Sequence, residues 1–141
     1  MRVGDGSSFA SGDEEIRVGI DLVSVAEIQA SITRFGARYS ERVFTDHERA
    51  SAKGDDRTFA SSLAARFAAK EATMKVLRPS SADSIPWTAI EVRTAENGAC
   101  SLALHGLAEE LAVTAKLGQF ALSMSHQGDM AVAIVLARKR P

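Results

Sequence analysis

The sequence predicts an α+β fold in which an antiparallel sheet of short strands packs with a long central helix. Two observations carry this prediction. Several segments place apolar residues at every second position and are separated by turn-forming residues, a pattern typical of antiparallel hairpins. Between them, residues 59–77 contain neither Gly nor Pro and are rich in Ala, which favours one long helix. Hairpins combined with helices are typical of α+β folds.

The segment before the central helix is predicted to contribute one strand and two helices. Residues 18–23 favour a short buried strand with Val18, Ile20 and Leu22 on one face. A first helix is predicted to open at Ser24 and to end near Gly36. A capping box at residues 45–48 starts a second, short helix that ends by Gly54.

The segment after the central helix is predicted to form two hairpins around one helix. The apolar positions of the first hairpin are Ile90 and Val92 in one strand and Leu102 and Leu104 in the other. Asn97-Gly98 between them indicates a type I′ turn. A helix is predicted over residues 107–117 and is ended by Gly118. Residues 120–125 and 130–137 form the second hairpin.

Composition limits the class of protein. Residues 1–15 are rich in Gly, Ser and acids and are predicted to be a flexible tail, which leaves residues 16–141 as a single domain. A net charge of −1 argues against non-specific binding to nucleic acid. The single cysteine, Cys100, excludes an internal disulfide. No apolar run is long enough to span a bilayer and no signal peptide is visible, so we expect a cytoplasmic protein without a membrane partner.

The central helix carries charge inside its own apolar pattern. Its apolar positions recur at threes, fours and sevens, and Lys70 falls among them, where a hydrophobic residue belongs. Glu71 and Lys75, four residues apart, lie together on the flank. Two interpretations are open at this point. Lys70 either extends its ammonium to water along an apolar stem, or the helix departs from its pattern to form a functional site.

Polar groups also interrupt two of the predicted strands. Asp21 lies in the first, buried strand and therefore needs an ion pair, a hydrogen-bond network or a metal. Ser123 and Ser125 share one face of the strand that leads to His126. These three residues indicate either an ordinary polar strand end or a set of hydrogen-bond donors for a ligand.

The polar groups belong to three motifs. They are Gly19-Ile20-Asp21, the run Arg-Phe-Ala-Ala-Lys-Glu-Ala at residues 66–72 with Lys75, and Ser123-Met124-Ser125-His126 followed by Ala131-Val132-Ala133. In order, residue type and spacing they resemble the holo-acyl-carrier-protein synthase family, the small single-copy 4′-phosphopantetheinyl transferases. The resemblance runs from about residue 17 to residue 137, and the central run is its most specific part.

The resemblance implies a reaction and its metal. Enzymes of this family move 4′-phosphopantetheine from coenzyme A to a serine of an apo carrier protein and release adenosine 3′,5′-bisphosphate. Negative charge must then be held on both the attacking and the leaving oxygen. Mg²⁺ does this with one or two carboxylates, several waters and phosphate oxygens. The expected fold is the 4′-phosphopantetheinyl transferase fold, with one copy of the unit per chain and a homotrimer that shares its active sites.

The resemblance also implies roles for individual residues. Asp21 and Glu71 match the metal ligands of the family, and Lys75 matches the lysine that contacts the phosphates and stabilises the leaving charge or protonates it. Glu71, directly or through a metal-bound water, is the expected base for the serine. The residues expected to contact coenzyme A are Arg66, Lys70, Lys75, Ser123, Ser125 and His126.

Two features depart from the family pattern. Glu27 stands where related enzymes have an arginine that helps to dock the carrier protein, and a glutamate there repels an acidic carrier helix. Arg34, Arg38 and Arg42 follow at fours and form either a substitute basic stripe or an ordinary solvated face. The loop at residues 78–86 lacks the glycines that let backbone approach the coenzyme.

The departures leave alternatives to the transferase. One is a catalytically weak relative that binds coenzyme A or a metal ion and acts as a scaffold, and another is an interaction module in which Lys70 and His126 are structural. The partners expected for the transferase are coenzyme A and an apo acyl or peptidyl carrier protein. Carriers of fatty-acid, polyketide and peptide synthesis fit the sequence equally well.

Overall fold

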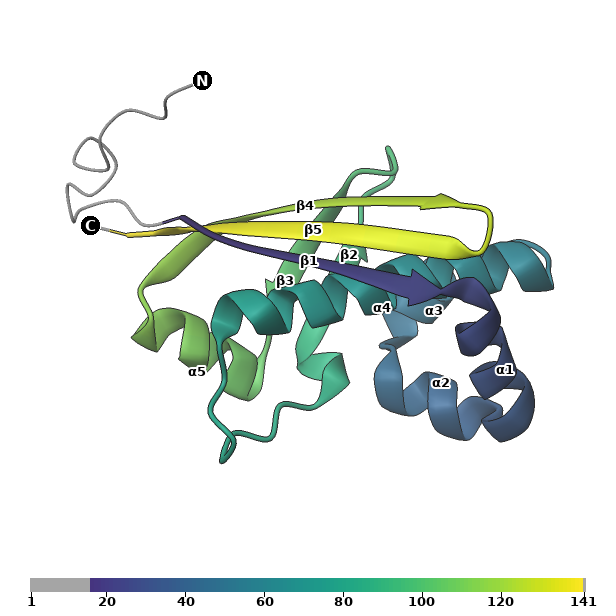
Figure 1. The fold of residues 1–141 in the computed structure, drawn as a ribbon, viewed down its shortest axis with the longest axis horizontal. Helices are drawn as coiled ribbons and strands as arrows, with labels where there is room; N and C mark the ends of the chain where they lie inside the picture. The colour runs from purple at the N-terminus through teal and green to yellow at the C-terminus, as the bar shows by residue number, and fades with distance from the viewer. Residues whose placement is uncertain (1–15, 141) are drawn as a thin grey trace, which may run out of the picture.

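A computed structural model describes residues 16–140 as one α+β unit with two antiparallel sheets (Figure 1). The prediction of a flexible tail at residues 1–15 lies outside the described residues. The elements, in chain order, are β1 (Ile16–Ser24), α1 (Val25–Phe35), α2 (Ala37–Val43), α3 (Asp46–Ser51), α4 (Asp56–Leu77), the 3-10 turn η2 (Trp87–Ala89), β2 (Ile90–Thr94), β3 (Cys100–Leu104), α5 (Gly106–Thr114), β4 (Leu117–Gln127) and β5 (Met130–Lys139).

The larger sheet has the order β1-β5-β4, and every neighbouring pair in it is antiparallel. Its strands are 9 to 11 residues long, so the prediction of short strands applies only to the smaller sheet, β2-β3, whose strands have five residues each. In Figure 1, α4 runs along one face of the larger sheet, with α1, α2 and α3 towards one end and α5 towards the other. Among residues 16–140, no helix combines the length and apolarity needed to cross a membrane.

The central helix α4 is buried on most of its sides, not along one stripe. Its many alanines make this possible, because Ala64, Ala68, Ala69 and Ala72 are fully buried and keep the helix thin. The closest approach is at Gly19 of β1. A Cβ atom built there would lie only 2.1 Å from the carbonyl oxygen of Ala72, so glycine is required by the contact between strand and helix.

The prediction of a buried strand at residues 18–23 is wrong for the face that carries Val18, Ile20 and Leu22. Val18, Ile20 and Leu22 are 58%, 56% and 62% exposed, whereas Gly19 and Val23 face the core. Strand alternation defines two faces but does not say which one is covered. Here the helix packs on the face with the small residue, and the larger apolar side chains lie on the outer face of the sheet. That face continues on β5 with Ile134 and Leu136, which pair with Ile20 and Val18.

Three further boundaries differ from the prediction. Gly36, at φ 60°, ends α1 as predicted, but a second helix, α2, starts directly after it. The β2–β3 turn is not of type I′, because Ala95 and Ala99 close a three-residue loop in which only Gly98 has a positive φ. Helix α5 ends at Thr114, and Lys116, with φ 59°, lies in the turn after it, so that Leu117, the last residue predicted for that helix, belongs to β4.

Candidate active site

The structure brings Asp21, Glu71 and Lys75 together where β1 crosses α4. Glu71 and Lys75 lie one turn apart on α4. The Nζ of Lys75 donates to the carbonyl oxygen of Ile20 at 2.7 Å and to Oδ1 of Asp21 at 3.3 Å. The close approach at Gly19 allows this short reach, since the strand passes directly over the helix two residues before Asp21. These three predicted residues therefore share one place in the fold.

A pocket of about 370 Å³, the carboxylate pocket, opens beside them between β1, α1, α2 and α4. Asp21 and Glu71 lie in its wall together with Glu27, Ser31, Tyr39 and Phe67. Tyr39 was missed by sequence reasoning because α2 itself was missed. Glu27 was noticed only as a docking position, and its place beside the two other carboxylates comes from the packing of α1 against β1 and α4.

The electrostatics of this pocket are those of two neighbouring carboxylates. Burial raises the pKa of the Glu71 carboxyl, and the negative charge and hydrogen bond of Asp21 raise that pKa further. The ammonium of Lys75 acts in the opposite direction. The pair therefore carries negative charge that a proton or a cation would neutralise.

The donor set fits Mg²⁺, which takes one or two carboxylates and completes its shell with waters and phosphate oxygens. In the part of the chain that the structure describes, no group of three or more His, Cys, Asp or Glu side chains forms a metal site. An ion held by Asp21 and Glu71 would thus keep several positions for other ligands. Two carboxylates alone leave the coordination shell of such an ion incomplete, and phosphate oxygens of a substrate would complete it.

The surroundings of Lys70 contradict the prediction that this residue contacts coenzyme A. Its side chain is fully buried, and its Nζ donates to Oε1 of Glu48 at 2.7 Å. The same Nζ donates to the carbonyl oxygens of Trp87 at 3.0 Å and of Ile90 at 2.5 Å. An ammonium has three N–H groups, so all of them are occupied. Burial lowers the pKa of Lys70, whereas the Glu48 carboxylate raises it. Lys70 joins α4 to α3 and β2 and has a structural role.

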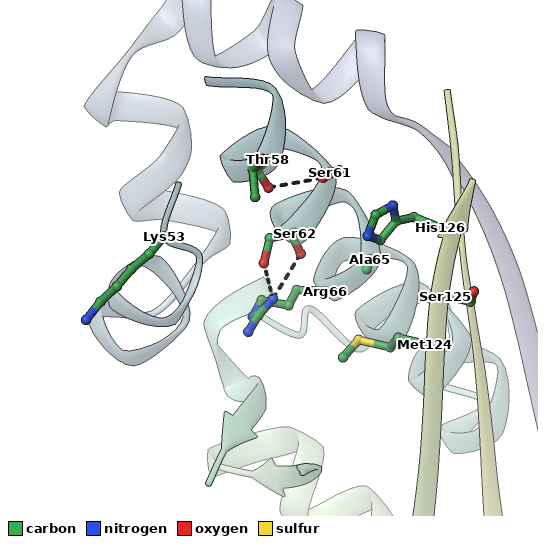
Figure 2. A pocket seen from close by; sticks show the side chains of 9 residues that line it. All are labelled: Lys53, Thr58, Ser61, Ser62, Ala65, Arg66, Met124, Ser125 and His126. Carbon is green, nitrogen blue, oxygen red and sulfur yellow. Dashed lines mark hydrogen bonds between the residues drawn. The ribbon is translucent and has the colours of Figure 1, made fainter. Parts of the chain in front are cut away.

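A second pocket, of about 290 Å³, lies on another side of α4 and is called here the arginine pocket (Figure 2). Arg66 of α4 and His126 of β4 line it, with Lys53 from the loop before α4. Arg66 is only 6% exposed, and its guanidinium donates to Ser62 and to Oγ1 of Thr94. Its Nε is buried without a hydrogen-bond partner within residues 16–140. Such a group indicates a missing acceptor.

The side chains of the two serines of the third motif lie on the outer face of the sheet, away from the arginine pocket. Ser123, beside Ile134, lines neither pocket. Ser125 borders the arginine pocket, but its side chain lies on the opposite side of β4 from Arg66 (Figure 2), which contradicts the prediction that these serines contact coenzyme A there. His126 points to the inner face because it follows Ser125 by one residue in the strand. The strand alternation that grouped the serines thus also separates them from the histidine.

Within one chain, the carboxylate pocket and the arginine pocket do not meet. Asp21 on β1 is level with Met124 on β4, and β5 lies between these two strands. His126 is two residues further along β4. Between Asp21 and His126 lie two strand-to-strand spacings across the sheet and two residues along the strand, which together correspond to about 12 Å. With α4 packed across that face, Asp21 and Glu71 lie on one side of the helix, and Arg66 and His126 on another.

The chain was compared with models of known protein families and with known proteins, and the matches point to one family. The family model described as the 4′-phosphopantetheinyl transferase superfamily matches residues 17–135. A protein of Herpetosiphon aurantiacus named holo-[acyl-carrier-protein] synthase is 36% identical, over 84% of this chain and 94% of its own length. A protein of Desulforudis audaxviator with the same name is 38% identical, over 85% of this chain and 90% of its own.

Solved structures of similar fold include two with coenzyme A. The Chronobacterium ammoniagenes ACPS–CoA complex matches with a TM-score of 0.75 and 33% identity, over 90% of this chain and 99% of that one. Holo-[acyl-carrier-protein] synthase of Helicobacter pylori in complex with coenzyme A matches with a TM-score of 0.73 and 27% identity, over 86% of this chain and 99% of that one.

Proposed function

The chain belongs to the 4′-phosphopantetheinyl transferase superfamily, and we propose that it transfers 4′-phosphopantetheine from coenzyme A to a serine of an apo carrier protein, releasing adenosine 3′,5′-bisphosphate. The observation that carries this proposal is the meeting of Asp21, Glu71 and Lys75 at an open pocket. Phosphoryl-type transfer depends mainly on positioned charge, and two carboxylates with one ammonium supply it.

In the proposed mechanism, Asp21 and Glu71 hold Mg²⁺. The ion, when bound, supplies Lewis-acid stabilisation of the charge on the transferred phosphate. Glu71 accepts the proton of the carrier serine. Lys75 is held at the pocket by the carbonyl oxygen of Ile20 and presents its ammonium to the departing phosphate.

The arginine pocket is the proposed site for the other phosphate groups of coenzyme A. Arg66, His126 and Lys53 provide cationic and donor groups there, and the unpartnered Nε of Arg66 supplies a buried donor for a phosphate oxygen. Ser123 and Ser125 are left out of this proposal because the side chains of both lie on the outer face of the sheet (Figure 2 shows that of Ser125).

A homotrimer would complete the reaction site. The outer face of the larger sheet exposes Val18, Ile20, Leu22, Ile134 and Leu136. A contiguous apolar face of this kind marks a contact surface. Since the two pockets lie apart within one chain, a neighbouring copy packed on that face would supply its arginine pocket to the carboxylate pocket of the first. We propose a trimer with active sites between subunits, working in the cytoplasm.

The proposed docking surface for the carrier lies at the corner between α1 and α2. Arg34 is in the last turn of α1, and Arg38 and Arg42 lie on α2, so the three do not form the single helical stripe that their spacing suggested. Arg38 and Arg42 line a pocket of about 350 Å³ with the half-exposed Phe35. A basic and apolar corner suits an acidic amphipathic helix of a carrier protein.

The test is a transfer assay with the purified protein, coenzyme A, Mg²⁺ and apo carriers from fatty-acid, polyketide and peptide synthesis. Each carrier is weighed by mass spectrometry before and after incubation. The expected result is a gain of one phosphopantetheine that disappears with EDTA. A folded protein that binds coenzyme A and modifies none of the carriers would instead favour the non-catalytic scaffold.

A further inference from the structure

The β4–β5 turn is joined to the start of α1 through Asp129. The backbone N–H of Val25 donates to the carbonyl oxygen of Asp129 at 2.7 Å. The N–H of Ala26 donates to Oδ1 of the same residue at 2.9 Å, and the hydroxyl of Ser24 donates to Oδ2 at 2.8 Å. Asp129 therefore accepts three hydrogen bonds from three consecutive residues. Two of these donors are N–H groups that a helix start leaves without an internal partner.

The same turn contacts α4 on its other side. The guanidinium of Arg57, in the first turn of α4, donates to the carbonyl oxygen of Gly128 at 3.2 Å. His126 lies only two residues before Gly128. One short turn is thus attached to α1, which borders the carboxylate pocket, and to the end of α4 that borders the arginine pocket.

Asp129 does more than cap a helix. Ser24 already provides a local cap for α1, because its Oγ accepts the N–H of Glu27 at 3.3 Å. The bonds to Asp129 come from 103 and 105 residues away in the chain. Since the local cap supports the helical conformation, the distant carboxylate fixes where α1 begins relative to the sheet.

The position of α1 matters for the side of the site that receives the carrier. Glu27, Ile28 and Ser31 of α1 line the carboxylate pocket, and Arg34 at its other end belongs to the proposed docking corner. The residues proposed to hold coenzyme A, in contrast, lie on α4, on β4 and in the loop before α4. A shift of α1 would therefore change recognition of the carrier and leave coenzyme binding in place.

We propose that Asp129 is a positioning residue for the transfer reaction, which fixes α1 against the β4–β5 turn and thereby aligns the carrier with the carboxylate pocket. This inference rests on the proposed function. Asp129 lines neither pocket, so it acts through α1 and touches neither substrate. This role predicts that loss of Asp129 raises KM for the carrier and leaves KM for coenzyme A nearly unchanged.

The experiment compares Asp129→Ala and Asp129→Asn with the unaltered protein, in steady-state assays that vary the carrier and coenzyme A separately. Removal of the acceptor is expected to raise KM for the carrier by about fivefold, the factor that corresponds to loss of one cap. KM for coenzyme A is expected to stay within twofold. Asparagine keeps an oxygen for Ala26 and an amide for Ser24, so it is expected to restore the carrier KM.

Two matched variants separate positioning from stability. Asp55→Ala removes the equivalent cap of α4, where Oδ1 accepts the N–H of Thr58 at 2.8 Å, and leaves α1 untouched. Arg57→Ala removes the other bond of the same turn. Both are expected to keep the carrier KM of the unaltered protein. An Asp129→Ala protein that melts lower but keeps that KM, or an Asn variant as impaired as Ala, overturns the inference. An inactive unaltered protein would overturn the proposed function instead.

Discussion

Gly19→Ala is the sharpest test of how the candidate site is built. Gly19 faces α4, and an added Cβ would lie 2.1 Å from the carbonyl oxygen of Ala72 and 3.3 Å from the Cβ of Lys75. Carbon and carbonyl oxygen atoms normally stay about 3.3 Å or more apart. Strand and helix therefore have to separate by about 1 Å. The oxygen belongs to the backbone in the middle of a helix and cannot turn aside.

The magnitude follows from that separation. Overpacking of this severity costs about 3 kcal/mol of unfolding free energy. For a chain of this size, such a loss lowers the melting temperature by about 10 °C. The site suffers as well, because Asp21 moves with the strand and Glu71 stays with the helix. A misplacement of about 1 Å in a reaction centre lowers turnover by about 100-fold.

Thermal unfolding followed by circular dichroism and initial transfer rates below the melting temperature measure the two effects. Gly36→Ala is the control, since a Cβ there meets nothing within 4 Å but the backbone has φ 60°. With ψ at −140° this backbone conformation is nearly confined to glycine, so the cost is conformational strain of about 1–3 kcal/mol without a steric contact. If Gly19→Ala melts no lower than Gly36→Ala and retains its turnover, the tight contact between β1 and α4 is not what holds Asp21 beside Glu71.

Five other changes are expected to have distinct effects. Folding raises the pKa of Glu71, so its charged form is disfavoured and stability falls as the pH rises through the interval between the unfolded and folded pKa. In EDTA and at a pH above that interval, Glu71→Gln should therefore raise the melting temperature. Transfer measured with Mg²⁺ should fall on the order of 100-fold. A lower melting temperature with normal turnover would contradict both points. Lys70→Met should lower the free energy of unfolding by about 3 kcal/mol, because the buried carboxylate of Glu48 loses its ion-pair partner. Lys75→Met should keep the melting temperature of the unaltered protein and lose transfer activity. Equal melting temperatures for these two lysine variants would argue against the separate roles. Ile20→Glu should convert the proposed trimer to monomers in light scattering and abolish transfer, and an active monomer would exclude shared sites. Glu27→Arg should tighten binding of an acidic carrier roughly tenfold, and unchanged affinity and salt dependence would place docking elsewhere.

Local sequence patterns correctly predicted the helices and caps that are determined by residues close together in the chain. The long helix followed from its alanines and the absence of Gly and Pro, and the capping box at Thr45 forms as its spacing indicates. Asp21, Glu71 and Lys75 were found through two motifs, one on the strand and one on the helix, and the structure places the three residues together beside the carboxylate pocket. The fold class is confirmed for the same reason, since hairpins and helices are visible in the residue periodicity.

The predictions that failed depended on partners far away in the chain. Glu48, 22 residues before Lys70, converts that lysine from a ligand candidate into half of a buried ion pair. Nothing in the helical pattern reveals such a partner. In the same way, alternation in β1 could not tell that α4 would cover the face of Gly19 and leave Ile20 exposed. The helix α2 was overlooked because Gly36 both ends one helix and precedes the next.

The first and the last of the described strands are neighbours in the sheet, seen as purple beside yellow in Figure 1. In their register, Ile16 of β1 pairs with Arg138 of β5. Such pairing requires closure of a very long loop and is a slow step in folding. The strand that carries Asp21 therefore joins the sheet only after β5 has been synthesised. A translation product interrupted before β5 would lack the only strand with which β1 pairs among the described residues.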